Sequence, residues 1–548
     1  MAKDKGVEAK THVITAAQGI QSPYSARAYG RDTDAGKPNK ALIRTIEDYV
    51  ERNNADLQIC AIAGSYVNEI ELDPFFHGRD DVFMHDKAIK RNEQNKVKEA
   101  NRREAFGEQQ TKRAEKAASR AESRQTDLDN PEFLQMLGMP MHYFWDDIPQ
   151  TSYRITGENL NSNLRVVGTQ SAPQNKDPLS GKQSLLKKFN GRSLILPATK
   201  QRLKSFASGQ AGKYPKLQIT TGACTYPSYN DTNQRGEEAE SMHAYGFVVA
   251  DILSDKVFIP RVVPAQKNGT FIDLGIKYSA GKKPEKVATD AMVVADSHVA
   301  EINPKVDRAN REQMKWFQPR YTHFNDIFDA LSINGHNLED SLLIDELHAQ
   351  GLDVLEREAV LTAEYIRDHA EIAREFGGEV FINFSNHDDM LYRWLTKFEW
   401  KKDKVNRRFA SKLYAQDPSK DNALRGMMKY VMPDMPDNVT FLKRGEDRIY
   451  WGFQCAAHGH LGKNGSRGSM KSLVEGYTKV VKGHTHEFEI SDDSIGVGTS
   501  AMIPMPYQLG QPISSMAANA VIYRGGLSQG IPVVKGKWSK ERFADVLD

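Results

Sequence analysis

Asp296 and His298 are separated by one residue and end an apolar run, AMVVADSH at residues 291–298. Val293 and Val294 favour a buried strand, so both polar side chains are expected to project from its carboxyl end. Open α/β sheets bind their ligands at that end. A carboxylate beside an imidazole suits a divalent metal ion. Asp-x-His alone is a weak signal, because many strands end in a polar loop.

The same pattern recurs four times downstream. Each time, an apolar run that favours a strand is followed by oxygen or imidazole side chains, the groups that bind Mn, Fe, Zn or Mg. Five such segments in order predict a metal centre. The four segments are YTHFNDIFD at 321–329, VFINFSNHD at 380–388, YWGFQCAAHGH at 450–460 and VVKGHTH at 480–486.

The order D-x-H, D-x-x-D, N-H-D, isolated His and G-H-x-H resembles the calcineurin-like metallophosphoesterase superfamily, which includes SbcD-type DNA nucleases, phosphodiesterases and protein phosphatases. The resemblance covers roughly residues 287–506, under half of the 548-residue chain. Asn325 stands where a Gly usually precedes the first Asp of D-x-x-D, and Ser385 stands where a Gly usually precedes Asn386. Neither residue is a ligand, so these departures concern loop geometry.

The resemblance implies two divalent metal ions, with Mn expected and Mg, Fe or Zn as alternatives. Two such ions roughly 3.5 to 4 Å apart lower the pKa of a bridging water and grip the phosphoryl oxygens. His484 and His486 are two residues apart, so in an extended segment both side chains would leave the same face. By resemblance, Asp326 bridges the metals, Asp296, His298 and His486 complete one site, and Asn386, His458 and His484 complete the other.

His387 directly follows a metal ligand and is therefore expected to face the substrate. In the family, the matching His stabilises the transition state or protonates the leaving oxygen, and the second Asp of D-x-x-D orients it. Here Asp329 would hold His387, and Asp388 could share that role. His458 immediately follows the apolar run and fits the isolated-His position better than His460, which stays a candidate for substrate binding.

Two local features favour nucleic acid as the substrate. Residues 394–414 interleave basic side chains, Arg407 and Arg408 among them, with aromatic ones. Basic side chains bind phosphates, and aromatic rings stack on bases. Alternatively, these aromatics pack against their own helix and the charges face water. Lys463 and Arg467 lie in a Gly-rich loop that could approach a polymer backbone closely.

Beyond the superfamily, the sequence is similar to siphophage pre-early proteins that degrade host DNA. That similarity implies a metal-dependent DNase acting in the bacterial host cytoplasm. One alternative is a metal-dependent phosphatase or small-molecule phosphodiesterase with the basic segment as a lid, because this scaffold hydrolyses many phosphate esters. Another is a non-catalytic DNA-binding or assembly protein, which the complete ligand set argues against.

The composition, 39% hydrophobic and 27% charged, is typical of a soluble globular protein, and a net charge of +2 gives no global argument for nucleic acid. No apolar run is long enough to cross a membrane, and the charged N-terminus shows no secretory signal, so we expect a cytoplasmic protein. Cys60, Cys224 and Cys455 lie in apolar runs and are expected to be buried free thiols. No phosphate-binding G-x-x-x-x-G-K-[ST] motif is present, so no ATP motor is expected.

The expected fold class is α/β, with a metallophosphoesterase β-sandwich flanked by helices after N-terminal α/β and α+β domains. The length predicts two to four domains. The expected parts are a small α/β domain at 1–85, a charged helical arm at 86–126, an α+β domain at 127–286, the catalytic domain at 287–510 and a C-terminal tail packing on the core at 511–548.

The charged arm has no apolar stripe and should be exposed to solvent. Three roles are considered for this arm: a helix that is only solvated, a contact with the DNA backbone, or self-association into a homo-oligomer. Further along, His142, Asp146 and Asp147 lie in an aromatic-rich segment. We interpret them as turn residues in preference to a second metal site.

Overall fold

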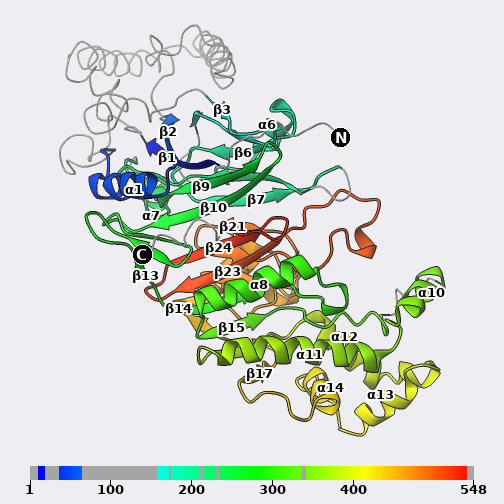
Figure 1. Ribbon diagram of the computed structural model, residues 1–548. Helices are drawn as coiled ribbons and strands as arrows, with labels where there is room; N and C mark the ends of the chain where they lie inside the picture. Colours follow the sequence, from blue (N-terminus) through cyan, green and yellow to red (C-terminus); the bar gives the residue numbers. More distant parts are fainter. Residues whose placement is uncertain are drawn as a thin grey trace, which may run out of the picture. The chain divides into compact units, whose positions relative to one another are not determined.

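The computed structural model describes residues 10–18, 36–63, 157–171, 176–209, 214–229, 234–334 and 341–539 (Figure 1). These residues form a mixed α/β protein, which confirms the expected class, while the metallophosphoesterase β-sandwich stays a prediction. The charged arm expected at 86–126 lies outside the described residues. So do His142, Asp146 and Asp147, and the last part of the expected C-terminal tail.

The chain divides into two compact units, each drawn from more than one segment. The domain boundaries expected near residues 85 and 126 lie outside the described residues, so the five-part division stays a prediction. Unit 1 comprises residues 1–201, 219–256 and 265–270, and unit 2 comprises residues 202–218, 257–264 and 271–548.

Unit 1 begins with the expected strand, helix and strand. Strand β1 (Lys10–Gln18) pairs in parallel with β2 (Asp56–Ala63), and helix α1 (Lys40–Arg52) makes the crossover that parallel strands require. On its other edge β1 pairs antiparallel with β9 (Tyr245–Ser254). The other elements here are β3 (Glu158–Asn159), β4 (Leu164–Val166), β5 (Thr169–Ser171), α6 (Gln183–Lys188), β6 (Ser193–Leu196) and α7 (Gln234–Ser241).

The central sheet of unit 2 has the order β17-β16-β15-β14-β23-β24. Strands β14 to β17 pair in parallel, whereas β23 pairs antiparallel with both β14 and β24. The carboxyl ends of the four parallel strands therefore meet at one edge, where polar side chains can gather. The strands are β14 (Thr289–Val294), β15 (Tyr321–Phe324), β16 (Glu379–Ile382), β17 (Val439–Phe441), β23 (Ala517–Tyr523) and β24 (Ser528–Val533).

Helices α8 (Pro304–Phe317) and α11 (Leu355–Arg374) cover one face of this sheet and pack against each other (Figure 1). Helix α8 begins after Asn303, whose side chain accepts a hydrogen bond from the backbone of Lys305. The apolar face of α8, including Met314 and Phe317, is buried. This packing fixes the strands whose ends carry the polar residues.

A second set of paired strands in unit 2 brings the last histidine motifs together. Strand β20 pairs in parallel with β19 on one side and with β22 on the other. The segments that follow β19 and β20 are therefore neighbours. The order is β18 (Ile449–Tyr450), β19 (Phe453–Gln454), β20 (Lys479–Lys482), β22 (Ser494–Gly496), β21 (Glu489–Ser491) and β7 (Arg202–Phe206).

Helices α12, α13 and α14 pack on one another between the third and fourth motifs. Within the described residues, no helix is both long enough and apolar enough to cross a membrane. All three cysteines are buried and free, as expected. The remaining strands and α-helices are β8 (Lys216–Thr220), β10 (Val257–Ala265), β11 (Phe271–Asp273), β12 (Ile276–Tyr278), β13 (Glu285–Lys286), α10 (Ser341–Gln350), α12 (Asn386–Thr396), α13 (Arg407–Tyr414), α14 (Ala423–Val431) and α15 (Met470–Tyr477).

Candidate metal centre

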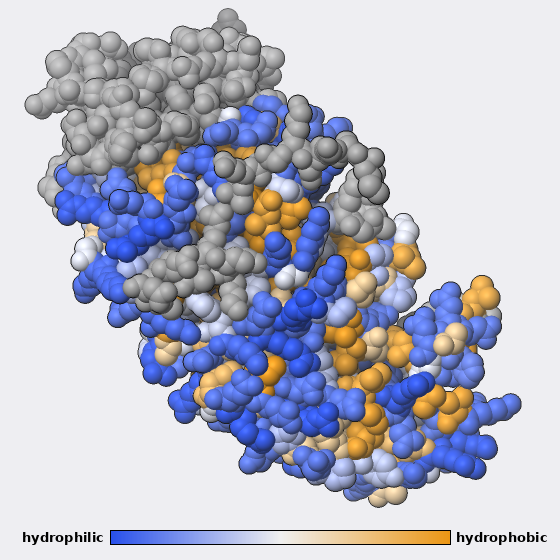
Figure 2. Space-filling view, in the orientation of Figure 1, coloured by the Kyte–Doolittle hydropathy of each residue, from blue (hydrophilic) through white to orange (hydrophobic). Residues whose placement is uncertain are grey.

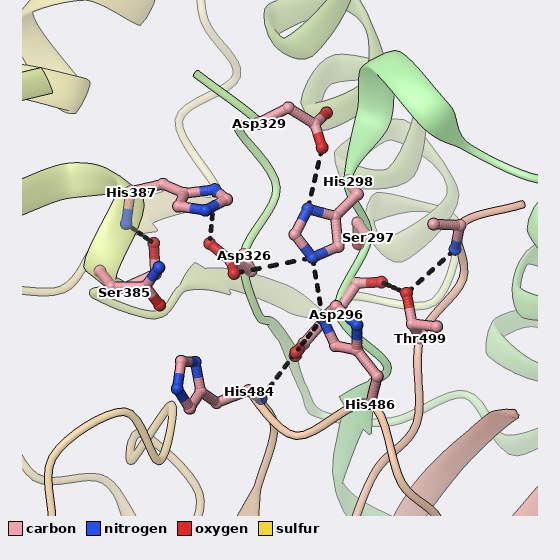
Figure 3. Close-up of polar contacts among 12 residues, drawn as sticks. Asp296, Ser297, His298, Asp326, Asp329, Ser385, His387, His484, His486 and Thr499 are labelled. Carbon is pink, nitrogen blue, oxygen red and sulfur yellow. Dashed lines mark hydrogen bonds and ion pairs between the residues drawn. The ribbon is translucent and has the colours of Figure 1, made fainter. Parts of the chain in front are cut away.

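Side chains from all five sequence motifs, His458 of the fourth among them, converge at the carboxyl edge of the central sheet of unit 2. Asp296 and His298 follow β14, Asp326 follows β15, and His387 lies in the first turn of α12 after β16. His486 reaches the same point from the segment after β20. Figure 3 shows these five side chains pointing toward one another. The strand order brings these side chains together, because the segments after β14, β15, β16 and β20 each begin where a parallel strand ends.

Asp296, His298 and His486 form a buried group that can hold a metal ion. Nε2 of His486 lies 3.0 Å from Nε2 of His298 and 3.3 Å from Oδ2 of Asp296. Nitrogen and oxygen ligands bind a metal such as zinc at about 2.0 to 2.2 Å, which places neighbouring ligand atoms roughly 3 Å apart. The structure thus assembles the first ligand group that the sequence suggested. Its role in binding metal stays a prediction.

Asp326 belongs to two further groups that can hold a metal ion, one with Asp296 and His458 and one with His298 and His387. Nε2 of His458 lies 3.5 Å from Oδ2 of Asp326. The same nitrogen lies 3.0 Å from the side-chain oxygen of Asn386. A carboxylate shared between groups is what a bridging ligand requires.

The electrostatics of the cluster fit a bound cation. Oδ1 of Asp296 and Oδ1 of Asp326 are both buried and accept no hydrogen bond. Buried carboxylates without compensation are costly, so such oxygens call for positive charge. Burial alone would raise the pKa of Asp326, but the imidazoles around it, His387 foremost, hold that pKa below its usual value. The donor set of carboxylates, imidazoles and one amide oxygen therefore fits divalent metal ions.

Asp329 hydrogen-bonds His298. The prediction that Asp329 holds His387 is therefore wrong. Oδ1 of Asp329 accepts a hydrogen bond from Nδ1 of His298 at 2.8 Å, and its Oδ2 accepts one from the backbone of Ala300 at 2.7 Å. Main-chain hydrogen bonds align the two loops, including one from His298 to the carbonyl of Asp326. That alignment places Asp329 beside the first motif.

The bond from Asp329 also sets the chemistry of His298. An ionised carboxylate can only accept a hydrogen bond, so Nδ1 carries the proton and Nε2 is directed at the other candidate ligands. Burial alone would lower the pKa of His298, but the hydrogen bond to Asp329 and the nearby carboxylates raise it to about 10. The pocket thus strongly favours positive charge at this position.

His387 is held by the backbone, and its neighbours cap the helix. Its Nδ1 lies 2.6 Å from the carbonyl oxygen of Phe328 and 3.3 Å from Oδ1 of Asp326. Ser385 is the N-cap of α12, accepting a hydrogen bond from the backbone of His387. Asp388, expected to share in orienting His387, instead accepts hydrogen bonds from Ser385. Burial raises the pKa of Asp388 to about 7.

The imidazole of His484 lies outside the three ligand groups, although its backbone nitrogen donates to Oδ2 of Asp296 at 2.6 Å (Figure 3). The prediction that the side chains of His484 and His486 leave the same face of an extended segment is wrong. The segment is not extended, because φ is +71° at His484 and +57° at His486. The ring of His484 contacts that of His458 instead. Burial, then the charge of His458, lowers the pKa of His484 to about 4.

Among the candidates for substrate binding, His460 packs near the metal centre and the four basic residues lie on the surface. The ring centroid of His460 is 5.4 Å from that of His458, and burial lowers the pKa of His460 to about 3. Lys463 and Arg467 are exposed in the loop before α15. Arg407 and Arg408 are exposed in the first turn of α13.

A buried polar network behind the centre was not predicted. Asn383 donates to the side-chain oxygen of Asn325 at 2.9 Å, so Asn325 has a structural partner. Nδ1 of His323 lies 2.9 Å from Oδ1 of Asn383, and its Nε2 lies 3.0 Å from the hydroxyl of Tyr450. The available signal was the presence of polar residues inside apolar strand segments, which are buried only when hydrogen-bonded.

Two further features of the site were missed by sequence reasoning. The hydroxyl of Tyr507 lies 3.1 Å from Nδ1 of His486. Gly483 opens the G-H-x-H motif where a Cβ would overlap the carboxylate of Asp296. Nothing in the spacing of Tyr507 pointed to the site, whereas a glycine before a ligand motif does signal a close approach.

Several site residues have left-handed backbone conformations. φ is +45° at His298 and +44° at Asp326, and it is also positive at His484 and His486. Residues other than glycine rarely adopt this region. Such strain persists where the surrounding structure imposes it, and it clusters at functional sites.

Comparison with known proteins gives one distant relative. No protein-family model matches the chain, and no solved structure matches it. The chain is 24% identical over 378 residues to Protein A1 of Escherichia phage T5, a match that covers 66% of this chain. The match also spans 66% of that relative, just under two thirds of its length.

Proposed function

We propose that this protein is a divalent-metal-dependent phosphodiesterase that cleaves DNA, and that it degrades host DNA during phage infection. The observation that carries the proposal is the position of Asp326, a buried carboxylate shared by two potential metal-binding groups. The similarity of the motifs to metallophosphoesterases and the match to a phage protein support the same function.

In this proposal Asp296, His298 and His486 hold one metal ion, and Asn386 and His458 contribute to the other with Asp326 between them. When bound, the ions would supply a nucleophile near neutral pH and neutralise charge on the phosphoryl group. The protein's own side chains do the rest.

In this proposal His387 acts on the substrate. Its side chain is 16% exposed, more than those of Asp326 and His298, so it can meet a bound phosphodiester. The carbonyl of Phe328 accepts from Nδ1, which leaves Nε2 to hydrogen-bond the leaving oxygen. The first turn of α12 adds the positive end of a helix dipole beside the anionic substrate.

The helical segment after α12 supports a polymeric substrate. Hydrophilic side chains predominate on the face of this region drawn in Figure 2, with hydrophobic ones between them. Phe398 and Tyr414 form a partly exposed pair with ring centroids 5.1 Å apart, and Nζ of Lys401 lies 4.1 Å from the Phe398 ring. Trp394 and Phe409 are buried, so these two pack internally as the alternative interpretation required. The exposed pair remains available to stack on bases.

The test is incubation of purified protein with linear DNA, closed-circular DNA and the small diester bis(p-nitrophenyl) phosphate. Each is supplied with Mn, with Mg or with chelator, beside an Asp326→Ala control. Metal-dependent loss of DNA that the variant lacks is the expected result, and attack on closed circles would identify an endonuclease. Hydrolysis of the small diester alone would contradict DNA as the substrate and favour a small-molecule phosphodiesterase.

A further inference from the structure

Residues 501–513, here called the rim loop, lie beside the metal centre and are anchored to two of its ligand segments. Ala501 forms an antiparallel β-bridge with Ile302, just after the first motif. The backbone N–H of Met502 donates a hydrogen bond to the carbonyl of Glu301 at 2.8 Å. Beyond the loop, the backbone of Met516 donates to the carbonyl of His486 at 3.1 Å. The loop is therefore fixed with respect to the ligands on both sides.

Internal hydrogen bonds give the rim loop a defined shape. The side chain of Gln508 accepts from the backbone of Met505 at 3.1 Å and donates to the hydroxyl of Ser515 at 2.9 Å. Gln511 donates to the carbonyl of Tyr507 at 3.0 Å. Met505 is buried and holds the loop to the body of unit 2.

This ordered loop nevertheless exposes large apolar side chains. Met502, Tyr507 and Leu509 are 52%, 62% and 63% exposed. Residues 501–513 include no charged side chain. The side chains of the loop therefore neither attract a phosphate by positive charge nor repel it by negative charge. What it offers beside the site is apolar and aromatic surface, which suits the flat face of a nucleobase.

Tyr507 joins this surface to the metal centre. Its hydroxyl lies 3.1 Å from Nδ1 of His486, whose Nε2 faces His298 and Asp296. With Nε2 directed at a metal, Nδ1 carries the proton and donates a hydrogen bond to the tyrosine oxygen. The ring of Tyr507 stays largely exposed while its hydroxyl is engaged.

We infer that Tyr507 orients His486 through its hydroxyl and, with Met502 and Leu509, supports the base adjacent to the scissile phosphate through its ring. Tyr507 is thus a positioning residue for the ligand and a contact residue for the substrate. The second role rests on the proposed function, whereas the first requires only that the centre bind metal.

Two variants separate these roles. Tyr507→Phe removes the hydroxyl and keeps the ring, while Tyr507→Ala removes both. Mn binding, measured by calorimetry on the full chain, should weaken at least tenfold and equally in both variants, because partners behind a ligand typically contribute this much. Wild-type Mn affinity in Tyr507→Phe would overturn the orienting role.

The base contact is read from the comparison of the two variants at saturating Mn. KM for a single-stranded oligonucleotide should be roughly tenfold higher in Tyr507→Ala than in Tyr507→Phe, as expected for loss of a stacking ring. On an oligonucleotide of the same length built from abasic sites, which keeps the phosphates and has no ring to stack, the two should be equal. Equal KM values on the oligonucleotide would overturn the base contact.

A surface control and a wild-type control complete the design. Leu342→Ser removes an exposed apolar side chain from α10, outside the rim loop, and should leave every value unchanged. Met502→Ser with Leu509→Ser should raise KM on the oligonucleotide without changing Mn affinity. If the wild-type protein hydrolyses the small diester but not DNA, the proposed function and the base contact both fail. The Mn measurement on Tyr507→Phe still decides the orienting role in that case.

Discussion

Oδ1 of Asp329 accepts a hydrogen bond from Nδ1 of His298 at 2.8 Å, behind the candidate metal centre. This contact makes Asp329 a partner of His298, a proposed metal ligand, whereas the resemblance implied a partner of His387. The difference has measurable consequences, because loss of a carboxylate behind a ligand affects metal affinity, and loss of one behind a catalytic histidine affects turnover.

We therefore predict that Asp329→Ala weakens Mn binding by about 10- to 100-fold, the usual cost of removing such a partner. Asp329→Asn should be milder, because its amide oxygen can still accept from Nδ1. Calorimetric titration of the purified variants with Mn measures both. Unchanged Mn affinity combined with reduced kcat in Asp329→Ala would instead assign the carboxylate to catalysis.

Asp326 and His387 should separate metal binding from turnover. Asp326→Ala removes a carboxylate shared by two ligand groups, so Mn binding and activity are expected to disappear together. His387→Ala should retain bound metal and lower kcat by about 10²- to 10⁴-fold, the range for removing a general acid. Metal content and single-turnover rates on the same preparations distinguish the two. Full activity of His387→Ala would rule out the catalytic assignment.

Gly483→Ala is predicted to damage the site through a single methyl group. The added Cβ would overlap the Asp296 carboxylate, which must then move away from His486. We expect a loss of Mn affinity of at least tenfold with little change in secondary structure, measured by calorimetry and circular dichroism. Gly476→Ala is the matched control, because a Cβ at residue 476 meets nothing within 4 Å. Equal Mn affinity in the two variants would show that the carboxylate tolerates the methyl group.

His323 should make the protein less stable in acid. Burial, with a smaller effect of Arg448, lowers the pKa of His323 from 6.5 to about 4. The unfolded chain then binds the proton more readily than the native one, so stability present above pH 6.5 is lost as the pH falls toward 4. Between pH 7.5 and pH 5 the lost contribution is about 2 kcal/mol.

Urea unfolding at these two pH values, with chelator present, measures this effect against a His323→Gln variant. The wild-type protein should lose about 2 kcal/mol more free energy of unfolding than the variant, which has no titrating group at this position. Equal losses in both proteins would show that His323 is not the source.

The sequence was sufficient to predict the strands and most of the residues that converge. Each motif follows an apolar run, and parallel strands place their carboxyl ends at one edge, so the spacing of Asp296, Asp326 and Asn386 along the chain was enough to place them together. The strand positions also agree, since β15 lies entirely within the expected run 321–329 and four of the six residues of β14 lie within 291–298.

The partners of these residues could not be predicted in the same way. Asp329 faces His298 because main-chain hydrogen bonds align two loops, and no side-chain spacing encodes that alignment. His484 turns away from His486 because of positive φ, which the pattern of an extended segment excludes. Tyr507 reaches the site from a loop without periodicity. Loop geometry is set by tertiary contacts, which a local pattern does not record.

The backbone is in the left-handed region at four residues of the candidate centre, and this strain lowers the stability of the native state. The residues are His298, Asp326, His484 and His486. Each is expected to cost about 1 to 3 kcal/mol, and glycine at the same position would relieve it. An Asp326→Gly chain should therefore unfold at higher denaturant concentration than Asp326→Ala, while lacking the site equally. A scaffold with no use for these side chains would gain stability by losing them, so their joint presence supports the proposed metal site.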